Sequence, residues 1–359
     1  MNILQVFPGN IWGGAEQYVL DLSAALEEAG HRVFYMARDY RPLRQRLEGK
    51  DVRFVGSLKI RNPRAASMLC RTVRDHEIDL VHIHDVKNVP FVFFSLRKCG
   101  RMPKVVVTRH IARPSKTFLL ARPYFRKLHS IIFVSGLSRR LWLEANPWMP
   151  VEKCKAICNS IPDMRGGRSG ESLRGKYNIP EDVPLLVYTG RVRRSKGCSV
   201  IVEALSKLGN LPFHMVFIGN LKPQAYGEEL MDLARKGGIG AKVSLYGFSD
   251  NVRQLIREAD IGVAPSIVRE ACPLSPMEFM QAGKCVVATD NGAQPEYIRN
   301  MVTGILVPPD DVEKLTEALE TVIVDKNLRE SIGRNACEYF NAEMNYSKYV
   351  SRILDCYTD

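Results

Sequence analysis

The chain has 359 residues, a length at which two domains are more common than one. With 45% hydrophobic and 25% charged residues, it has the composition of a globular protein, which excludes a disordered or fibrous chain. Its apolar runs are shorter than the roughly 18 to 20 residues of a membrane-spanning helix, and the N-terminus lacks the basic start and apolar core of a signal peptide. We therefore expect a two-domain cytoplasmic protein.

Charge is divided unevenly along the chain. Residues 1–150 carry 25 Lys and Arg against 12 Asp and Glu, whereas residues 151–359 carry 26 against 27. The first half is therefore expected to attract phosphate groups, whether in lipid headgroups, nucleic acid or an anionic substrate. The nine cysteines lack the dense regular spacing of a secreted disulfide framework and are predicted to be reduced thiols.

Short apolar runs alternate with amphipathic helical stretches, which predicts parallel sheets covered by helices. A helix is predicted at 15–29, directly after the first strand. The predicted strands of the first half are residues 3–7, 32–35, 80–84, 104–108 and 130–134. Those of the second half are residues 185–188, 215–218, 242–246, 261–264 and 285–288.

The two series of strands predict the α/β class, with Rossmann-like domains at 1–162 and 173–342. The polar, glycine-rich segment 163–172 carries no periodic apolar pattern and is expected to link them. Because open α/β sheets bind ligands at the carboxyl ends of their strands, we expect the chemistry in a cleft between the two domains.

Two loops after predicted strands hold candidate anion-binding residues. Gly13 and Gly14 stand directly before the first helix, where bare backbone N–H groups face an anion, although a plain turn explains them equally well. After strand 185–188, Arg191 and Lys196 could converge on a diphosphate, or could form a solvated basic loop.

A pair of acids, Glu270 and Glu278, is separated by seven residues that include two prolines. The prolines forbid a continuous helix, so Glu270 is expected in a loop after strand 261–264 and Glu278 in the first turn of the next helix. Alternatively, Glu278 completes a capping box with Ser275 as the N-cap and Pro276 as the first helical residue. That alternative leaves Glu270 unexplained.

Together these motifs resemble the retaining glycosyltransferases of family 4, which have the GT-B fold. The resemblance rests on Gly13-Gly14-Ala15-Glu16, Gly190-Arg191 with Lys196-Gly197, the two acids and the segment 283–289. It implies transfer of a hexose-type sugar from a UDP- or GDP-sugar to a hydroxyl of a glycan or lipid-linked acceptor, with no cofactor besides this co-substrate. It also implies that a final helix, within 343–359, crosses back to the first domain.

The resemblance assigns roles to matching residues. Arg191 and Lys196 bind the diphosphate, which the loop of Gly13 and Gly14 also approaches. Glu270 contacts hydroxyls of the transferred sugar.

The same resemblance implies that Glu278 binds the ribose hydroxyls. The backbone N–H of Leu274 faces the phosphate and sugar, and carries more of that role because Pro273 has no N–H. His110 matches a histidine near the sugar and the attacking hydroxyl. His84 competes for this position, and either histidine could simply be a strand-end residue with satisfied hydrogen bonds.

Two further expectations concern the reaction. No Asp-x-Asp occurs in the sequence, so we expect transfer without a metal ion, with the two cations stabilising the leaving diphosphate. The sequence offers no evident carboxylate nucleophile, and the family favours same-face attack in which the departing phosphate accepts the acceptor's proton.

Residues 101–150 hold ten basic side chains and one acid. In the stretch 113–127, bases alternate with aromatic and leucine side chains, which favours peripheral docking on the cytoplasmic face of an anionic membrane. The alternative is an ordinary amphipathic helix that packs on the sheet. The basic residues of this stretch are Arg113, Lys116, Arg122, Arg126 and Lys127.

Other functions compatible with the sequence are a nucleotide-sugar epimerase or a phosphorylase on the same fold. From a different class, a basic nucleic-acid-binding protein fits the charge of the first half. The sequence contains no aromatic-basic RNA motif, helix-turn-helix or zinc pattern, so we expect no nucleic-acid partner.

Overall fold

The structure is a computed structural model that describes all residues except 8, 10–11, 61, 164–171, 222 and 359. It divides into two compact units: unit 1 comprises Met1–Asn159 with Tyr346–Asp359, and unit 2 comprises Ser160–Asn345. Most of the predicted linker, 163–172, lies outside the described residues. In the described part of the chain, no helix has both the length and the apolar character needed to cross a bilayer.

Unit 1 is built on a parallel sheet that has seven strands within the described residues. The strands are β1 (Asn2–Phe7), β2 (Arg32–Arg38), β3 (Val52–Val55), β4 (Leu80–Ile83), β5 (Lys104–Arg109), β6 (Ser130–Phe133) and β7 (Cys154–Ala156). Their order in the sheet is β3-β2-β1-β4-β5-β6-β7. The succession reverses between β1 and β4, and ligands of open α/β sheets bind at such a point.

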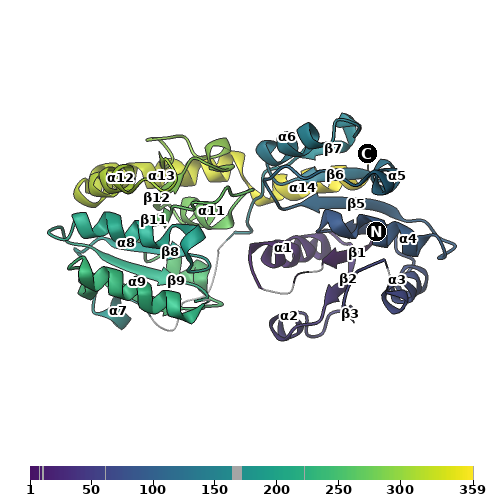
Figure 1. The fold of residues 1–359 in the computed structure, drawn as a ribbon, viewed down its shortest axis with the longest axis horizontal. Coiled ribbons are helices and arrows are strands. Elements are labelled where there is room, and N and C mark those ends of the chain that lie inside the picture. The colour runs from purple at the N-terminus through teal and green to yellow at the C-terminus, as the bar shows by residue number, and fades with distance from the viewer. Residues whose placement is uncertain (8, 10–11, 61, 164–171, 222, 359) are drawn as a thin grey trace. The chain divides into compact units, whose positions relative to one another are not determined.

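The helices of unit 1 include the C-terminal one. They are α1 (Gly14–Glu28), α2 (Arg41–Arg46), α3 (Pro63–Asp75), α4 (Val89–Leu96), α5 (Arg122–Arg126), α6 (Gly136–Ala145) and α14 (Tyr346–Thr358). In α1, Val19, Leu22 and Leu26 recur at three- and four-residue spacing and are buried. Helix α14, yellow in Figure 1, packs against β5 and β6, so the end of the chain stabilises the first sheet.

Unit 2 repeats this architecture with a parallel sheet in the order β10-β9-β8-β11-β12-β13. Its strands are β8 (Leu185–Thr189), β9 (His214–Ile218), β10 (Val243–Gly247), β11 (Ile261–Ala264), β12 (Cys285–Thr289) and β13 (Ile305–Val307). Its helices are α7 (Leu173–Tyr177), α8 (Cys198–Lys207), α9 (Gln224–Lys236), α10 (Val252–Ile256), α11 (Leu274–Gln281), α12 (Val312–Val324) and α13 (Lys326–Glu343). Here the succession reverses between β8 and β11.

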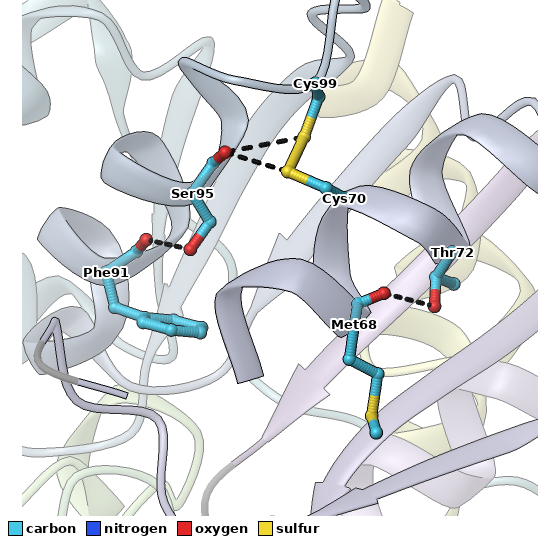
Figure 2. The surroundings of a disulfide bond; sticks show 6 residues. All are labelled: Met68, Cys70, Thr72, Phe91, Ser95 and Cys99. Carbon is cyan, nitrogen blue, oxygen red and sulfur yellow. Dashed lines mark hydrogen bonds between the residues drawn. A yellow bond between two sulfur atoms is a disulfide. The ribbon is translucent and has the colours of Figure 1, made fainter. Parts of the chain in front are cut away.

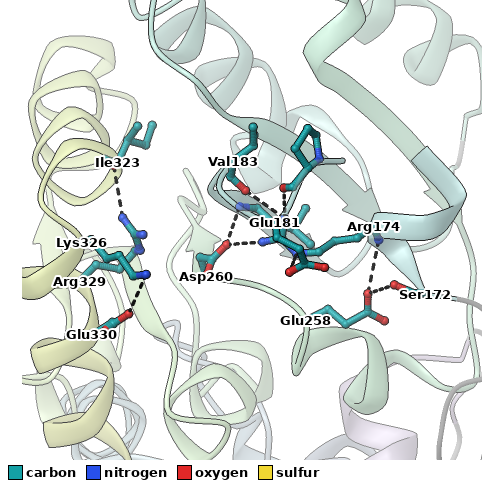
Figure 3. A network of polar contacts seen from close by, with 12 residues as sticks. Ser172, Arg174, Glu181, Val183, Glu258, Asp260, Ile323, Lys326, Arg329 and Glu330 are labelled. Carbon is teal, nitrogen blue, oxygen red and sulfur yellow. Dashed lines mark hydrogen bonds and ion pairs between the residues drawn. The ribbon is translucent and has the colours of Figure 1, made fainter. Parts of the chain in front are cut away.

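An ion-pair network fixes the amino ends of these two central strands (Figure 3). Arg174, on α7, donates to Asp260 Oδ2 at 2.8 Å, and the same oxygen accepts the backbone N–H of Leu185 at 2.8 Å. Glu258 accepts hydrogen bonds from the hydroxyl of Ser172 at 2.6 Å and from the start of α7. The amino ends of β8 and β11 are thus cross-connected, and their carboxyl ends are left to the site.

The structure confirms the predicted α/β class with parallel sheets. Each predicted strand corresponds to an observed strand whose ends differ by at most three residues. Strands β3, β7 and β13 were not predicted from the sequence. These are among the shortest strands, and the half-exposed residues of β3 and the exposed Lys155 of β7 dilute their apolar pattern.

The prediction that all cysteines are reduced thiols is wrong for one pair: Cys70 and Cys99 form a disulfide (Figure 2). Helices α3 and α4 pack against each other and bring the two Cα atoms to 5.0 Å, within the range of a disulfide. The carbonyl oxygen of Ser95 lies 2.9 Å from the sulfur of Cys70. Since 29 positions separate the two cysteines, spacing alone did not reveal the pair. The seven other cysteines, all within the described residues, form no disulfide.

Candidate functional site

At the carboxyl edge of the unit 2 sheet, close backbone contacts bring loops together. Gly219, after β9, has φ +151°, and a Cβ atom there would lie 1.8 Å from the carbonyl oxygen of Gly190, after β8. Gly197 has φ +72°, and a Cβ atom there would lie 1.9 Å from the carbonyl oxygen of Pro265, after β11. Only glycine fits at these two positions. The residue before Gly197, Lys196, is thereby held beside the loop that follows β11.

Lys196 and Glu270 form an ion pair at this edge. Their side chains are 19% and 18% exposed, and the hydroxyl of Ser266 donates to Glu270 Oε1 at 2.8 Å. The backbone carbonyl of Glu270 accepts the N–H of Ala293 at 3.1 Å, which fixes the loop from the side of β12. An ammonium group has three N–H donors, so Lys196 can hold Glu270 and still donate to a phosphate oxygen.

Arg191 lies on the loop between β8 and Lys196, and its side chain is exposed. The hydroxyl of Tyr188 donates to the Arg191 carbonyl at 2.9 Å, so the backbone of this loop is fixed while the guanidinium faces solvent. The two predicted cations are therefore on one loop but in different environments, Arg191 exposed and Lys196 paired.

Glu278 is nearly buried, with 7% exposure, and accepts a hydrogen bond from Arg253 Nε at 3.0 Å. Helix α11 begins at Leu274, so Glu278 lies in its second turn rather than in the predicted first turn. The capping-box alternative is also wrong, because Ser275 lies inside the helix and its hydroxyl accepts from Thr189 Oγ1 at 2.7 Å.

Pro273 is the N-cap of α11, and Pro276 occupies the third helical position. Both fit because the first turn of a helix needs no intrahelical N–H bonds. Among the first three helical residues, only Leu274 and Ser275 have an N–H to offer a ligand. Leu274, which was predicted to donate its amide, is thus placed with a backbone N–H at the positive end of α11.

In unit 1, a cavity of about 270 Å³ opens at the carboxyl ends of β1, β4 and β5. Both candidate histidines, His84 and His110, line it, together with Asp85, Arg109 and Glu16. Because both histidines line this cavity, its position does not distinguish between the two candidates. His84 is buried, with 7% exposure, and His110 is half-buried.

The two histidines belong to a polar chain at this edge. His84 Nε2 lies 2.7 Å from Gln5 Oε1, and His84 Nδ1 lies 3.4 Å from His110 Nε2. The ring of Tyr18 meets that of His110 edge-on, with centroids 4.7 Å apart. Burial lowers the pKa of His110 to about 4 and holds that of His84 well below its usual range, so both rings are neutral near pH 7.

The N-terminus of α1 faces a carboxylate. Gly13 is the N-cap and Gly14 the first helical residue, and Glu16 follows in the first turn. A Cβ atom on Gly9 would lie 1.8 Å from Glu16 Oε1, so the Glu16 side chain lies close against the preceding loop. A carboxylate here offsets the positive end of the helix and competes with an anion for it.

Arg109 also lines the cavity and had no predicted role. It is 2% exposed, its Nη2 donates to the carbonyl of Arg113 at 2.7 Å, and its guanidinium lies 4.6 Å from the ring centroid of Trp142. Burial lowers its pKa to about 10. Its position beside His110 at the end of a predicted strand could have indicated it. Gln5 and Arg253 carried no comparable sequence pattern.

The stretch 113–127 contains a surface that is both apolar and basic. Phe118, Leu119 and Leu120 are 86%, 70% and 88% exposed. Of the basic residues, Arg113, Lys116, Arg126 and Lys127 are exposed, whereas Arg122 is half-buried over the ring of Trp148.

Further along, Phe125 is buried and Tyr124 stacks on Phe93. The part of the stretch around these two residues therefore packs against the rest of unit 1, as the alternative of an amphipathic helix predicted. Helix α5 covers five residues, and 118–120 precede it.

Among the described residues, no group of three or more His, Cys, Asp or Glu side chains is placed to hold a metal ion.

Comparisons with known proteins match both units. Residues 12–165 match Glycosyltransferase Family 4, and residues 169–339 match Glycosyl transferases group 1. The glycosyltransferase EpsD of Bacillus subtilis is 31% identical over 74% of this chain and 73% of its own. A phosphatidyl-myo-inositol mannosyltransferase of Mycolicibacterium smegmatis is 26% identical over 91% of this chain and 85% of its own.

The solved structure of Anabaena HepE in complex with UDP-glucose superimposes with a TM-score of 0.83. It is 20% identical, and the match covers 99% of this chain and 98% of that one. This likeness supports the same GT-B fold for the α/β units described above. The chain belongs to the family 4 glycosyltransferases, the group 1 glycosyl transferases.

Proposed function

We propose that this glycosyltransferase transfers a hexose-type sugar from a UDP- or GDP-sugar to a hydroxyl of a glycan or lipid-linked acceptor, with retained stereochemistry and without a metal ion. The observation that carries this proposal is the Lys196–Glu270 pair at the point where strand succession reverses in unit 2. A cation beside a carboxylate provides one group for a diphosphate and one for sugar hydroxyls.

The comparisons support the donor and acceptor classes. The HepE structure contains UDP-glucose, and the name of the mycobacterial relative gives phosphatidyl-myo-inositol as its acceptor. On this basis we assign a nucleotide sugar as donor and a lipid-linked or glycan hydroxyl as acceptor.

In the proposed reaction, the bond between the anomeric carbon and the phosphate oxygen breaks, and a glycosidic bond forms on the same face. Arg191 and Lys196 stabilise the negative charge that develops on the diphosphate, and the N–H of Leu274 adds a backbone donor at the helix start. The departing phosphate accepts the proton of the attacking hydroxyl. The absence of Asp-x-Asp from the sequence supports this assignment of charge stabilisation to side-chain cations.

The acids and the histidine position the sugar. Glu270 accepts hydrogen bonds from sugar hydroxyls, and Glu278, held by Arg253, accepts those of the ribose. In unit 1, His110 contacts a hydroxyl of the sugar or of the acceptor from the cavity it lines.

A panel of UDP- and GDP-sugars tests the donor class directly. A nucleotide sugar at 100 times its Kd should stabilise the protein by about 2.7 kcal/mol, which a thermal shift detects. Transfer with that donor should continue in EDTA. Activity that is lost in EDTA and restored by magnesium contradicts the metal-free reaction, and hydrolysis or epimerisation without transfer contradicts the transferase.

We also propose that the surface formed by Phe118, Leu119, Leu120 and the exposed bases around them docks on an anionic membrane, on the cytoplasmic face. Exposed apolar side chains enter the headgroup region, and each nearby base contributes about 1 kcal/mol at an anionic surface. The three exposed apolar residues are consecutive and lie between basic residues, which is the chemistry of an interfacial segment.

Liposome sedimentation tests the docking. Binding should require anionic lipid, weaken with salt, and fall when Lys116, Arg126 and Lys127 are changed to Ser. Arg122 is left intact because it packs on Trp148. The matched control removes the same charge from exposed lysines of unit 2, Lys207, Lys236 and Lys326, and should bind as the unchanged protein does. Equal binding to neutral vesicles, or none at low salt, overturns the proposal.

A further inference from the structure

Gln5, His84 and His110 form a hydrogen-bonded chain that leads from the interior of the unit 1 sheet to its cavity. Gln5 lies on β1 and is fully buried, His84 follows β4, and His110 follows β5. The strands β1, β4 and β5 are successive neighbours in the sheet, so the three side chains come from adjacent positions at one edge. The chain ends at a residue that lines the cavity.

The direction of the hydrogen bonds follows from the chemistry of the first member. The amide oxygen of Gln5 can only accept, so His84 Nε2, 2.7 Å away, carries the proton and donates it. A neutral imidazole has a single N–H, so His84 Nδ1 has none and must accept. The group that faces it at 3.4 Å is His110 Nε2, which must therefore carry a proton.

Burial keeps these histidine rings neutral near pH 7. Desolvation lowers the pKa of His82 to about 3 and of His110 to about 4, and holds that of His84 well below its usual range. The ring centroids of His82 and His84 are 4.2 Å apart, so a positive charge on one ring would also disfavour a positive charge on the other. Of the other groups in contact with them, Tyr18, Thr108 and Tyr357 bear hydroxyls and are uncharged near pH 7. The charged residues Glu16, Asp85 and Arg109 line the cavity beside His84 and His110.

We propose that Gln5 and His84 are positioning residues that fix His110 as its Nε2–H tautomer, and so present its Nδ1 lone pair as a hydrogen-bond acceptor for a hydroxyl of the sugar or of the acceptor. Within the described residues, His84 is the hydrogen-bond partner of His110, which leaves Nδ1 for a ligand. Only the last step, the contact with a substrate hydroxyl, rests on the proposed function.

Nuclear magnetic resonance of the full chain labelled with 15N-histidine tests the tautomers without any assay of activity. Long-range 1H–15N spectra distinguish a protonated from an unprotonated ring nitrogen, and removal of one histidine at a time assigns the signals. We expect Nε2–H for both His84 and His110 at pH 7. Nδ1–H on His110 overturns the proposal, and so does Nδ1–H on His84, which would mean that the Gln5 amide is turned around.

Gln5→Met removes the acceptor at similar size and should release the preference, giving a mixture of both tautomers at His110. Thr108→Val is the matched control, because it removes a buried hydroxyl that contacts His82 at 2.7 Å, outside the chain to His110. It should leave the spectrum of His110 unchanged. A fixed Nε2–H tautomer in folded Gln5→Met contradicts the proposed relay, and the spectrum of the unchanged protein decides the matter if this variant fails to fold.

Kinetic measurements test the contact between His110 and a substrate hydroxyl. Loss of one neutral hydrogen bond corresponds to roughly a 2- to 12-fold effect, so kcat of Gln5→Met should fall within that range. If the hydroxyl belongs to the donor, hydrolysis of the donor without acceptor slows as well. If it belongs to the acceptor, only transfer slows. Unchanged rates of both overturn the substrate contact, whereas absence of any transfer by the unchanged protein would contradict the proposed function and leave the tautomers standing.

Discussion

Unit 1 and unit 2 share one strand order through six strands, with β1 and β4 of unit 1 placed as β8 and β11 are in unit 2. At the carboxyl edge of its sheet, unit 1 has a hydrogen-bonded chain of neutral groups, the buried Gln5 and His84 with the half-buried His110. The charged residues Glu16, Asp85 and Arg109 line the cavity beside this chain. The edge of unit 2 is built from charges in pairs, Lys196 with Glu270 and Arg253 with Glu278.

The difference follows from the cost of burying charge. A buried ionisable group either neutralises or takes a counter-charge. The histidines of unit 1 follow the first course, which suits hydrogen bonds to hydroxyls, and the acids and bases of unit 2 follow the second, which suits an anion. The large positive charge of residues 1–150 is thus not concentrated in the neutral histidine chain, and part of it lies on the exposed surface around 118–120.

Acidification tests whether the histidines of unit 1 are neutral in the folded state, and it should have the largest effect on stability. The folded-state pKa values of His82 and His110 are lowered to about 3 and about 4, so below pH 6.5 the unfolded chain binds protons that the folded chain does not. The contribution of these histidines to stability is therefore constant above about pH 6.5 and is lost as pH falls toward 4, by about 1.4 kcal/mol per pH unit for each histidine.

All three tryptophans lie in unit 1, so urea unfolding followed by their fluorescence at pH 7 and pH 5 measures this loss for unit 1 alone. His82→Gln should reduce the slope. A free energy of unfolding that is the same at both pH values would show that these histidines are not neutral in the folded state.

The two units also differ in covalent links, since unit 1 contains the Cys70–Cys99 disulfide and the described cysteines of unit 2 form no disulfide. Closing a loop of this length stabilises the fold by about 3–4 kcal/mol. Dithiothreitol should therefore destabilise unit 1, again by tryptophan fluorescence, and should have no effect on the variant Cys70→Ser/Cys99→Ser. Titration of nine thiols in the denatured protein before reduction, instead of seven, would disprove the bond.

On the charged edge, Glu270→Gln should reduce kcat by about 10- to 150-fold, because a charge-assisted hydrogen bond contributes roughly 1.5–3 kcal/mol. Glu229→Gln is the control, because Glu229 pairs with Arg194, two positions before Lys196, and the side chains of this pair are about half or more exposed. Surface pairs contribute little, so its kcat should stay within twofold. Equal losses in both variants would indicate a general electrostatic effect instead of contact with the sugar.

The smallest change should come from Glu278→Gln, with donor Kd rising about 10-fold and kcat at saturating donor unchanged, as expected for loss of one charge-assisted bond to the ribose. Isothermal titration with the nucleotide sugar measures it. Unchanged donor affinity would assign Glu278 a purely structural role with Arg253.

Much of the candidate site could be predicted because its residues follow strands. Lys196, Glu270 and His110 stand in loops after apolar runs, and parallel strands bring such loops to one edge. The alternative of a capping box at Ser275 was wrong, because α11 begins at Leu274 and the restricted backbone of Pro273 suits the N-cap position. Burial, which decides the protonation of His84, has no local sequence pattern.

By itself, the sequence determined the α/β class, the strand-end positions of the site residues and the family, because these depend on local periodicity and on motifs that are contiguous in the chain. Only the tertiary structure decided which side chains meet: Lys196 with Glu270, Arg253 with Glu278, Cys70 with Cys99, and Gln5 with His84. These partners are 74, 25, 29 and 79 positions apart, and pairing over such separations depends on how strands order and helices pack, which no local pattern encodes.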